Sequence, residues 1–182
     1  VMFPMVTDVS EFLEAKRTLD IEVKNAMARK EKVPKEIIVG TMLEVPSLIF
    51  QLEKLLPYVD FVSVGTNDLA QFMFAADRTN TLLSNRYDVL SPAFLKMLKY
   101  VADMCTAFNV KCSVCGEMAS RPVDALTLVA LGYRVLSMSP EALGGVKMAV
   151  SSLELARFEK YLYSRLDSAQ SSFREDLCAY LR

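Results

Sequence analysis

Two acidic residues stand where buried apolar segments of the sequence end. Glu44 closes the segment 36–44, and Asp68 follows Phe61–Val64 within the turn Gly-Thr-Asn-Asp (65–68). In parallel α/β folds the carboxyl ends of the strands share one rim, where functional residues collect. One βαβ step separates the two carboxylates, so they can converge from adjacent strands. Such a pair suits Mg²⁺, which keeps waters and takes further ligands from a substrate phosphate. The alternative is that each residue only caps a helix.

The turn at 65–68 and an arginine beyond it could hold an anion. Backbone N–H groups at a helix N-terminus attract phosphates, and the amide of Asn67 could add a further hydrogen bond. Arg78, ten residues after Asp68, could reach back as a phosphate clamp. The alternatives are an ordinary capped turn and, for Arg78, a surface ion pair with Asp77.

Cys115 ends the apolar segment 110–115, just before Gly116. A thiol at this position is a candidate proton donor or acceptor, and its alternative role is that of a small buried hydrophobe. Cys112 and Cys115 form a C-x-x-C pattern, but residues i and i+3 of a strand point to opposite faces. This pattern therefore predicts neither a zinc site nor a disulfide.

The composition limits the function further. The chain has 182 residues, 21 Lys and Arg against 22 Asp and Glu, and no His. The balanced charge argues against nucleic-acid binding. The lack of His excludes triads and phosphohistidine chemistry within the chain. The sequence holds no apolar run of ~18 residues that could span a membrane. Four cysteines without a disulfide framework predict a cytoplasmic protein, and a start at Val1 suggests a piece of a longer one.

The elements that must position these residues alternate between strand and helix. The predicted strands cover residues 1–6, 36–44, 61–64, 110–115 and 134–138. The predicted helices cover residues 11–30, 48–56, 69–75, 91–108, 121–131 and 153–182. Apolar strands alternating with helices indicate a parallel sheet covered on both faces. The candidates are an open doubly wound sheet and part of a (β/α)₈ barrel. A complete barrel needs ~250 residues, so the second reading gives the C-terminal part of a barrel, about five of its eight strands, across residues 1–182.

Six motifs occur together and in order along the chain. They are Met-Phe-Pro-Met (2–5), Gly-Thr-Met-Leu-Glu-Val-Pro-Ser (40–47), Asp-Phe-Val-Ser-Val-Gly-Thr-Asn-Asp-Leu-Ala-Gln (60–71), Ala-Asp-Arg-Thr-Asn (76–80), Ser-Pro-Ala (91–93) and Cys-Gly-Glu-Met-Ala (115–119). Up to about residue 150 the chain resembles the PEP-utilising enzyme family, in particular the phosphoenolpyruvate–protein phosphotransferases, enzyme I of the bacterial phosphotransferase system. It looks most like the nitrogen-related paralogue, with the sugar-transport enzyme as second choice.

The resemblance implies a PEP-binding domain from a (β/α)₈ barrel. Glu44 and Asp68 match the family's Mg²⁺ ligands. Asn67 and Arg78, with Asp68, match residues that hold PEP. Cys115 matches the cysteine that handles the proton at the enolpyruvate C3. The expected cofactor is therefore Mg²⁺, and the expected small molecules are PEP and pyruvate.

The resemblance also implies what this chain lacks. The family's other phosphate-binding arginines lie on earlier strands, and the histidine that accepts the phosphoryl group lies in a separate N-terminal domain. That domain passes the group to an HPr-like phosphocarrier protein. We therefore expect a phosphotransferase activity in the longer protein and none in this chain alone, together with a homodimer and self-association through open sheet edges.

Two alternatives remain open from the sequence. The same barrel occurs in pyruvate phosphate dikinase and PEP synthase, and an upstream ATP-grasp domain would identify these. A non-catalytic dimerisation or regulatory module is the other alternative, against which the complete set of site residues argues.

Overall fold

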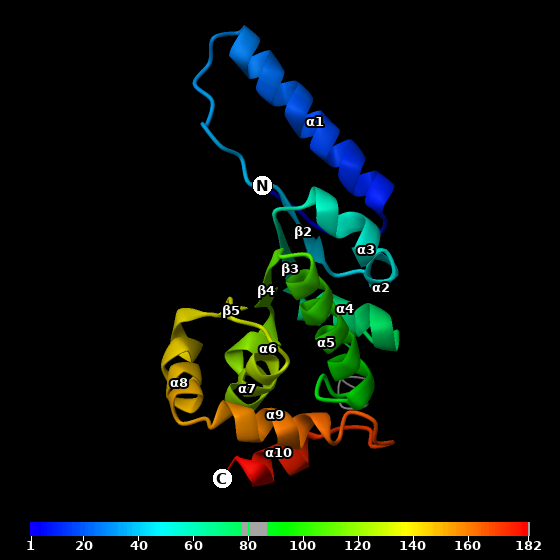
Figure 1. Cartoon of the computed structure of the whole chain (residues 1–182), viewed down its shortest axis with the longest axis vertical. Helices are drawn as coiled ribbons and strands as arrows, with labels where there is room; N and C mark the ends of the chain where they lie inside the picture. Colours follow the sequence, from blue (N-terminus) through cyan, green and yellow to red (C-terminus); the bar gives the residue numbers. More distant parts are fainter. Residues whose placement is uncertain (78–79, 81–86, 182) are drawn as a thin grey trace.

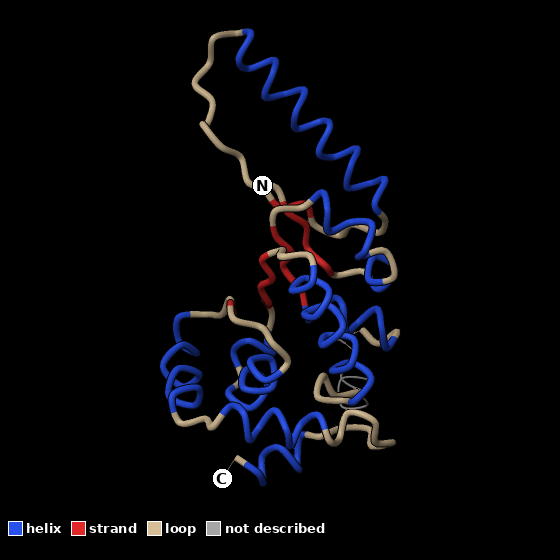
Figure 2. The backbone as a smooth tube through the Cα atoms, in the orientation of Figure 1, coloured by secondary structure: helices blue, strands red, loops and turns tan. Residues whose placement is uncertain are grey.

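A five-stranded parallel sheet lies at the centre of the fold (Figure 2). The computed structural model describes residues 1–77, 80 and 87–181. The strands are β1 (Met2–Phe3), β2 (Gly40–Leu43), β3 (Phe61–Gly65), β4 (Lys111–Cys115) and β5 (Val135–Leu136). Within the described residues their order in the sheet is the order along the chain.

This sequential order distinguishes the two fold classes that the sequence left open. A doubly wound sheet reverses its strand order at a switch point, whereas each barrel strand lies beside its chain neighbours. The strands here follow the second pattern, and helical segments separate each strand from the next. The α/β fold class is therefore confirmed, with a sheet that has the arrangement of five strands of a (β/α)₈ barrel.

Helices account for most of the chain (Figure 1). Their bounds are α1 (Val9–Ala28), α2 (Pro46–Ile49), α3 (Leu52–Leu55), the 3₁₀ helix η1 (Leu56–Tyr58), α4 (Thr66–Phe74), α5 (Pro92–Ala107), α6 (Glu117–Ser120), α7 (Pro122–Ala130), α8 (Pro140–Ser151), α9 (Leu155–Tyr163) and α10 (Arg174–Tyr180). In Figure 1, α1 extends away from the sheet, and α9 and α10 lie below α6 and α7. Among the described residues no helix is long and apolar enough to cross a bilayer.

The main helices begin where the sequence places their capping residues. The side chain of Asp8 accepts a hydrogen bond from Glu11 N at 3.0 Å and so caps α1. Ser91 caps α5 in the same way, followed by Pro92 in the first turn. These caps satisfy donors that the first turn of a helix leaves without a partner.

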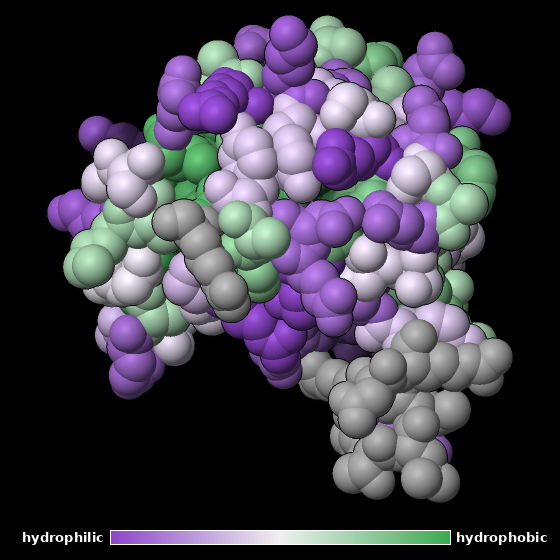
Figure 3. Space-filling model, turned by 90° about the horizontal axis from the view of Figure 1, so that it is seen from below, coloured by the Kyte–Doolittle hydropathy of each residue, from purple (hydrophilic) through white to green (hydrophobic). Residues whose placement is uncertain are grey.

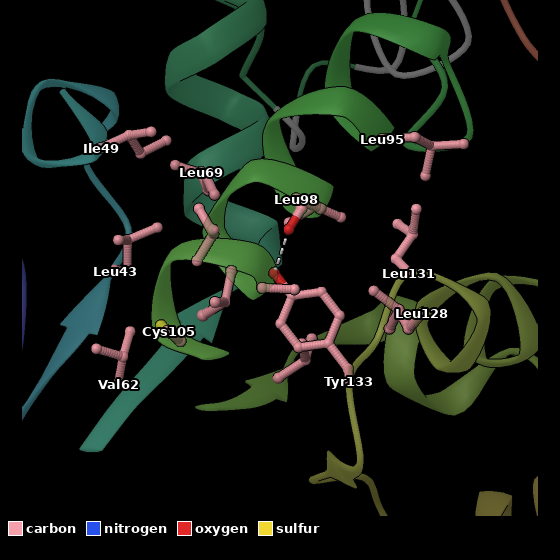
Figure 4. Packing of buried hydrophobic residues seen from close by; sticks show 14 of the residues in the cluster. Leu43, Ile49, Val62, Leu69, Leu95, Leu98, Cys105, Leu128, Leu131 and Tyr133 are labelled. Carbon is pink, nitrogen blue, oxygen red and sulfur yellow. Dashed lines mark hydrogen bonds between the residues drawn. The ribbon is translucent and has the colours of Figure 1, made fainter. Parts of the chain in front are cut away.

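Apolar side chains of the sheet pack against α5 and α7 to form the core (Figure 4). Tyr133 is 1% exposed, and its hydroxyl donates a hydrogen bond of 2.8 Å to the carbonyl of Leu98. Burial raises the pKa of Tyr133 well above its ordinary value, so the side chain stays neutral. The core therefore holds α5 and the end of α7 in a fixed relation to the sheet.

The second strand is shorter than the sequence predicts. The segment 36–44 is regular only from Gly40, where β2 begins. Immediately before this point the N–H of Val39 bonds to Oδ2 of Asp60 at 2.7 Å instead of to a neighbouring strand. The apolar residues of this segment predict a longer strand. The strand begins later because the N–H of Val39 bonds to the Asp60 side chain and not to the backbone of a neighbouring strand.

Two helical segments also differ from the prediction. The segment 48–56 contains α2, α3 and η1 instead of one helix, with a break at Phe50 and Gln51. Phe50 is 89% exposed, whereas the Gln51 amide oxygen accepts a hydrogen bond from Val9 N at 3.4 Å. The break therefore turns Gln51 toward the start of α1.

The segment after the last strand begins with a helix that our sequence reading left unassigned. Helix α8 starts at Pro140, directly after Ser139, which is a common helix start. Beyond it, α9 and α10 replace the single helical tail predicted for 153–182, because the chain turns back between them.

Candidate functional site

The carboxyl ends of β2, β3 and β4 bring most of the sequence-predicted residues to one edge of the sheet. Glu44 directly follows β2, and Asp68 lies in the first turn of α4, directly after β3. Cys115 is the last residue of β4 and pairs in register with Gly65 at the end of β3. We call these four residues and Asn67 the carboxyl edge.

Glu44 is the most buried acid of the carboxyl edge. It is 6% exposed, and its Oε2 accepts a hydrogen bond of 2.9 Å from the N–H of Met5, which follows β1. Gly65 makes room for this side chain, since a Cβ on Gly65 would lie 2.7 Å from Cγ of Glu44 and 2.9 Å from Oε1. The glutamate therefore lies across the end of β3, next to the start of α4.

Asp68 is half-buried in the first turn of α4. Among the described residues its side chain makes no hydrogen bond or ion pair. An acid is favourable in the first turn of a helix because of the helix dipole. The carboxylate of Asp68 is therefore available to bind a ligand.

Asn67 connects the end of β3 to the end of β4. Its Oδ1 accepts the N–H of Glu117 at 3.1 Å, and the hydroxyl of Thr66 donates to the carbonyl of Cys115 at 3.0 Å. Gly116 has φ +110°, and a Cβ there would lie 2.5 Å from Oγ1 of Thr66 and 2.9 Å from Oδ1 of Asn67. Since its oxygen is engaged, the Asn67 side chain presents its NH₂ donors to a ligand.

Cys115 lines a shallow hollow at the carboxyl ends of the strands. The hollow has a volume of about 320 Å³ and is lined by Asn67, Cys115, Gly116, Glu117, Ser120, Ser137, Met138 and Ser139. Cys115 is half-buried, and its Sγ lies 3.8 Å from Oγ of Ser63 and 3.6 Å from the carbonyl oxygen of Val64. A small anionic molecule in this hollow would contact both the thiol and the Asn67 amide.

The two thiols of the C-x-x-C pattern lie on opposite faces of β4, as the strand geometry predicts. Cys112 interacts with Cys105 of α5, on the helix-covered face, and this thiol neighbour together with burial raises the pKa of Cys112. Cys115 faces Ser63 instead. All four cysteines are free thiols.

The sequence predicted most residues of the carboxyl edge but not the residues that hold them in place. Arg78 lies outside the described residues, so its predicted role stays a prediction. The residues that support the edge are Ser63, Thr66, Gly116 and Met5, and none of them was assigned this role from the sequence. Gly116, next to Cys115, carried a signal, because a glycine at a strand end often marks a close approach of two backbones.

The donor set of the carboxyl edge fits a cation that takes few protein ligands. The described residues contain no group of three or more His, Cys, Asp or Glu that could hold a metal ion. Two carboxylates that follow adjacent strands, Glu44 after β2 and Asp68 in the first turn of α4, match the needs of Mg²⁺, and a backbone N–H holds the first of them. Zinc would require a closed set of four nitrogen or sulfur ligands, which this edge does not provide.

The fold and the edge define an α/β barrel-type protein with an acidic, amide-bearing site at the carboxyl ends of its strands. Residues 1–155 match the family described as "PEP-utilising enzyme, PEP-binding domain". The chain therefore belongs to the PEP-utilising enzymes.

Curated relatives agree with this assignment. The chain is 36% identical to the "Phosphoenolpyruvate-dependent phosphotransferase system" protein of Escherichia coli, over 100% of this chain and 24% of that protein. It is 37% identical to the phosphoenolpyruvate-protein phosphotransferase of Borreliella burgdorferi, over 92% of this chain and 29% of that one. It is 36% identical to the phosphoenolpyruvate synthase of Pyrococcus furiosus, over 85% of this chain and 18% of that one. The chain thus spans about a quarter of the length of these relatives.

Proposed function

We propose that this chain forms part of the PEP site of a phosphoenolpyruvate–protein phosphotransferase. The observation that carries the proposal is the convergence of Glu44, Asp68, Asn67 and Cys115 at one edge of a parallel sheet, in a chain of this family. An acidic pair, an amide donor and a thiol correspond to the three needs of PEP: a cation for the phosphate, orientation of the anion and a proton for carbon.

In the proposed site Glu44 and Asp68 hold Mg²⁺. When bound, Mg²⁺ offsets the negative charge of the phosphoryl group, which is the main requirement of phosphoryl transfer. The hydrogen bond from Met5 N fixes the Glu44 carboxylate before any ligand arrives. This fixed orientation reduces the conformational entropy lost when ligands bind.

Asn67 and the start of α4 orient the phosphate. The bond between Glu117 N and Oδ1 of Asn67 fixes the side-chain amide and leaves its N–H donors for the phosphate. Arg78 adds a guanidinium that pairs with phosphate oxygens. Together with Asp68, these residues select a small, highly charged anion.

Cys115 supplies the proton. Once the phosphoryl group has left PEP, the enolate of pyruvate must be protonated at carbon, and a thiol beside the bound molecule can act as the general acid. The hollow next to the thiol provides the space for the methylene group of the substrate.

In the longer protein the phosphoryl group passes to a histidine of another domain and then to an HPr-like phosphocarrier protein. This chain contains no His, so it cannot accept the group itself. We further propose that this longer protein is a cytoplasmic homodimer. The match to a PEP synthase favours a second candidate, a PEP domain of the synthase or dikinase type.

Isothermal titration with PEP, in the presence and absence of Mg²⁺, tests the proposal. We expect PEP to bind this chain only when Mg²⁺ is present, and more weakly than it binds a full-length relative such as the Escherichia coli protein. Absence of any Mg²⁺-dependent binding would contradict the assigned site. An affinity equal to that of the full-length relative would contradict the idea that this chain holds only part of the site.

A further inference from the structure

Ser63 is a buried hydroxyl in the middle of β3 that the proposed function does not use. It is 7% exposed and lies in register with Ser113 of β4. Its hydroxyl donates a hydrogen bond to Sγ of Cys115 at a distance of 3.8 Å. The thiol in turn donates to the carbonyl of Val64 at 3.6 Å. The thiol group of Cys115 therefore has both a donor and an acceptor on β3.

These two contacts have different consequences when the thiol loses its proton. The Val64 carbonyl can only accept a hydrogen bond, so its contact ends with the departure of the proton. The Ser63 hydroxyl can donate to the thiolate, and hydrogen bonds to charged groups are stronger than those to neutral groups. Ser63 can therefore keep its hydrogen bond to the sulfur after the proton has left and hold the sulfur at the same place in the edge.

We propose that Ser63 is a positioning residue for Cys115 in the protonation of the enolpyruvate carbon, an inference that rests on the proposed function. In this step the S–H bond breaks and a C–H bond forms at C3 of the enolate. The electron pair of the enolate C=C bond makes the new C–H bond, while the S–H pair stays on sulfur as thiolate. Ser63 acts by donating to that thiolate and touches no substrate atom.

Ser113 provides a matched control for Ser63. It is the same residue type, it lies opposite Ser63 in the register, and it belongs to the strand of Cys115 itself. Among the described residues, however, Ser113 makes no side-chain hydrogen bond to Cys115. A general effect of losing a serine hydroxyl from this sheet would therefore appear in both variants, whereas a positioning effect would appear only in Ser63→Ala.

The test measures the rate at which iodoacetamide alkylates Cys115 in this chain at neutral pH. Peptide mass spectrometry separates Cys115 from Cys178, which lies on α10 and serves as the internal reference. We expect Ser63→Ala to slow alkylation of Cys115 by about three- to tenfold, which is the value of one hydrogen bond. We expect Ser113→Ala to leave the rate unchanged and Ser63→Thr, which keeps the hydroxyl, to restore it.

Equal rates for Ser63→Ala and wild type would overturn the inference, as would equal slowing by Ser113→Ala. The Raman S–H stretching band of Cys115, isolated in each protein by subtraction of the spectrum of the same protein carrying Cys115→Ala, gives a second readout. We expect the band to shift in Ser63→Ala and to stay in place in Ser113→Ala. Neither assay contains PEP, so their outcome is independent of the titration that tests the proposed function.

Discussion

Acidic residues gather in two regions of this protein, and the two regions treat them differently. At the carboxyl edge, Glu44 accepts a single backbone N–H, and Asp68 has no partner among the described residues. In the outer helical layer, Asp88 and Asp124 both bind Arg174 of α10. The first region keeps its negative charge available to a ligand, whereas the second neutralises its charge within the chain.

The Arg174 cluster, which we define as Arg174, Asp88, Asp124 and Ser172, fastens the C-terminal segment to the rest of the domain. Arg174 lies 2.8 Å from Asp124, which is fully buried on α7, and 2.8 Å from Asp88. Ser172 adds a hydrogen bond to Asp88 at 2.7 Å. Figure 3 shows the molecule from below the view of Figure 1, where hydrophilic residues are mixed with hydrophobic ones.

The different environments of the two acids give them opposite pKa shifts. Burial raises the pKa of Asp124, and Arg174 offsets only part of this effect. Burial also acts on Asp88, but hydrogen bonds from Arg174, Leu90 N and Ser172 outweigh it and lower the pKa of that acid. The cluster therefore depends on the arginine to keep a buried carboxylate ionised.

The largest effect that we predict is the loss of Arg174. Arg174→Ala leaves the buried Asp124 with the longer contact to Arg121, at 4.0 Å, and removal of the main partner of a buried carboxylate costs about 3 kcal/mol. We expect the free energy of unfolding, measured by urea denaturation, to fall by that amount. Arg157→Ala is the control, because its ion pair with Glu154 is exposed on both sides. A loss below about 1 kcal/mol in Arg174→Ala, the value of a surface pair, would show that the cluster is not structural.

The next largest loss of stability is expected for Gly116→Ala at the carboxyl edge. Alanine at φ +110° is strained, and its Cβ would collide with Thr66 and Asn67, at a combined cost of about 2–3 kcal/mol. Gly144→Ala in α8 is the control, since a Cβ there meets nothing within 4 Å. That change should stabilise the helix by up to about 1 kcal/mol. Equal melting temperatures for the two variants would mean that Thr66 and Asn67 do not pack closely against Gly116.

A smaller change in the free energy of unfolding is expected when the pH is lowered. Because the folded-state pKa of Asp88 lies below the ordinary value of 3.8, its stabilisation is complete above that pH and is lost as the pH falls through the folded-state pKa. Asp124 has the opposite sign, since its raised pKa favours the protonated folded state at low pH. We expect Asp88→Asn to be less stable than wild type near neutrality and to lose less stability below about pH 4. Parallel stability curves for both proteins would contradict this assignment.

The sequence predicts the carboxyl edge better than it predicts the Arg174 cluster. Glu44, Asp68 and Cys115 stand at strand ends, and strand ends are visible as the points where apolar runs stop. Arg174 and Asp88 are far apart in the chain, and no local pattern indicates that they meet. Ser63 was missed because a small polar residue within an apolar strand has no periodic signal. The break at Gln51 was missed because a tertiary contact with Val9 overrides local helix preference.

Asp60 offers a direct comparison for the central residue of the site. Both Asp60 and Glu44 accept a backbone N–H beside β2, but Asp60 lies at the amino ends of the strands and Glu44 at the carboxyl ends. A change from carboxylate to amide at either position keeps an oxygen that can accept the hydrogen bond and removes the negative charge. Comparison of the two variants therefore distinguishes a role in supporting the sheet from a role in binding a ligand. Glu44→Gln and Asp60→Asn are the corresponding variants.

Isothermal titration of PEP with Mg²⁺ into these two variants tests the central claim most directly. We expect Asp60→Asn to bind PEP with the affinity of the wild-type chain. We expect Glu44→Gln to lose the Mg²⁺-dependent part of the binding, a reduction of about tenfold or more, while its free energy of unfolding stays close to that of wild type. Equal, Mg²⁺-dependent affinities in wild type and Glu44→Gln would contradict the assignment of the carboxyl edge as the cation site.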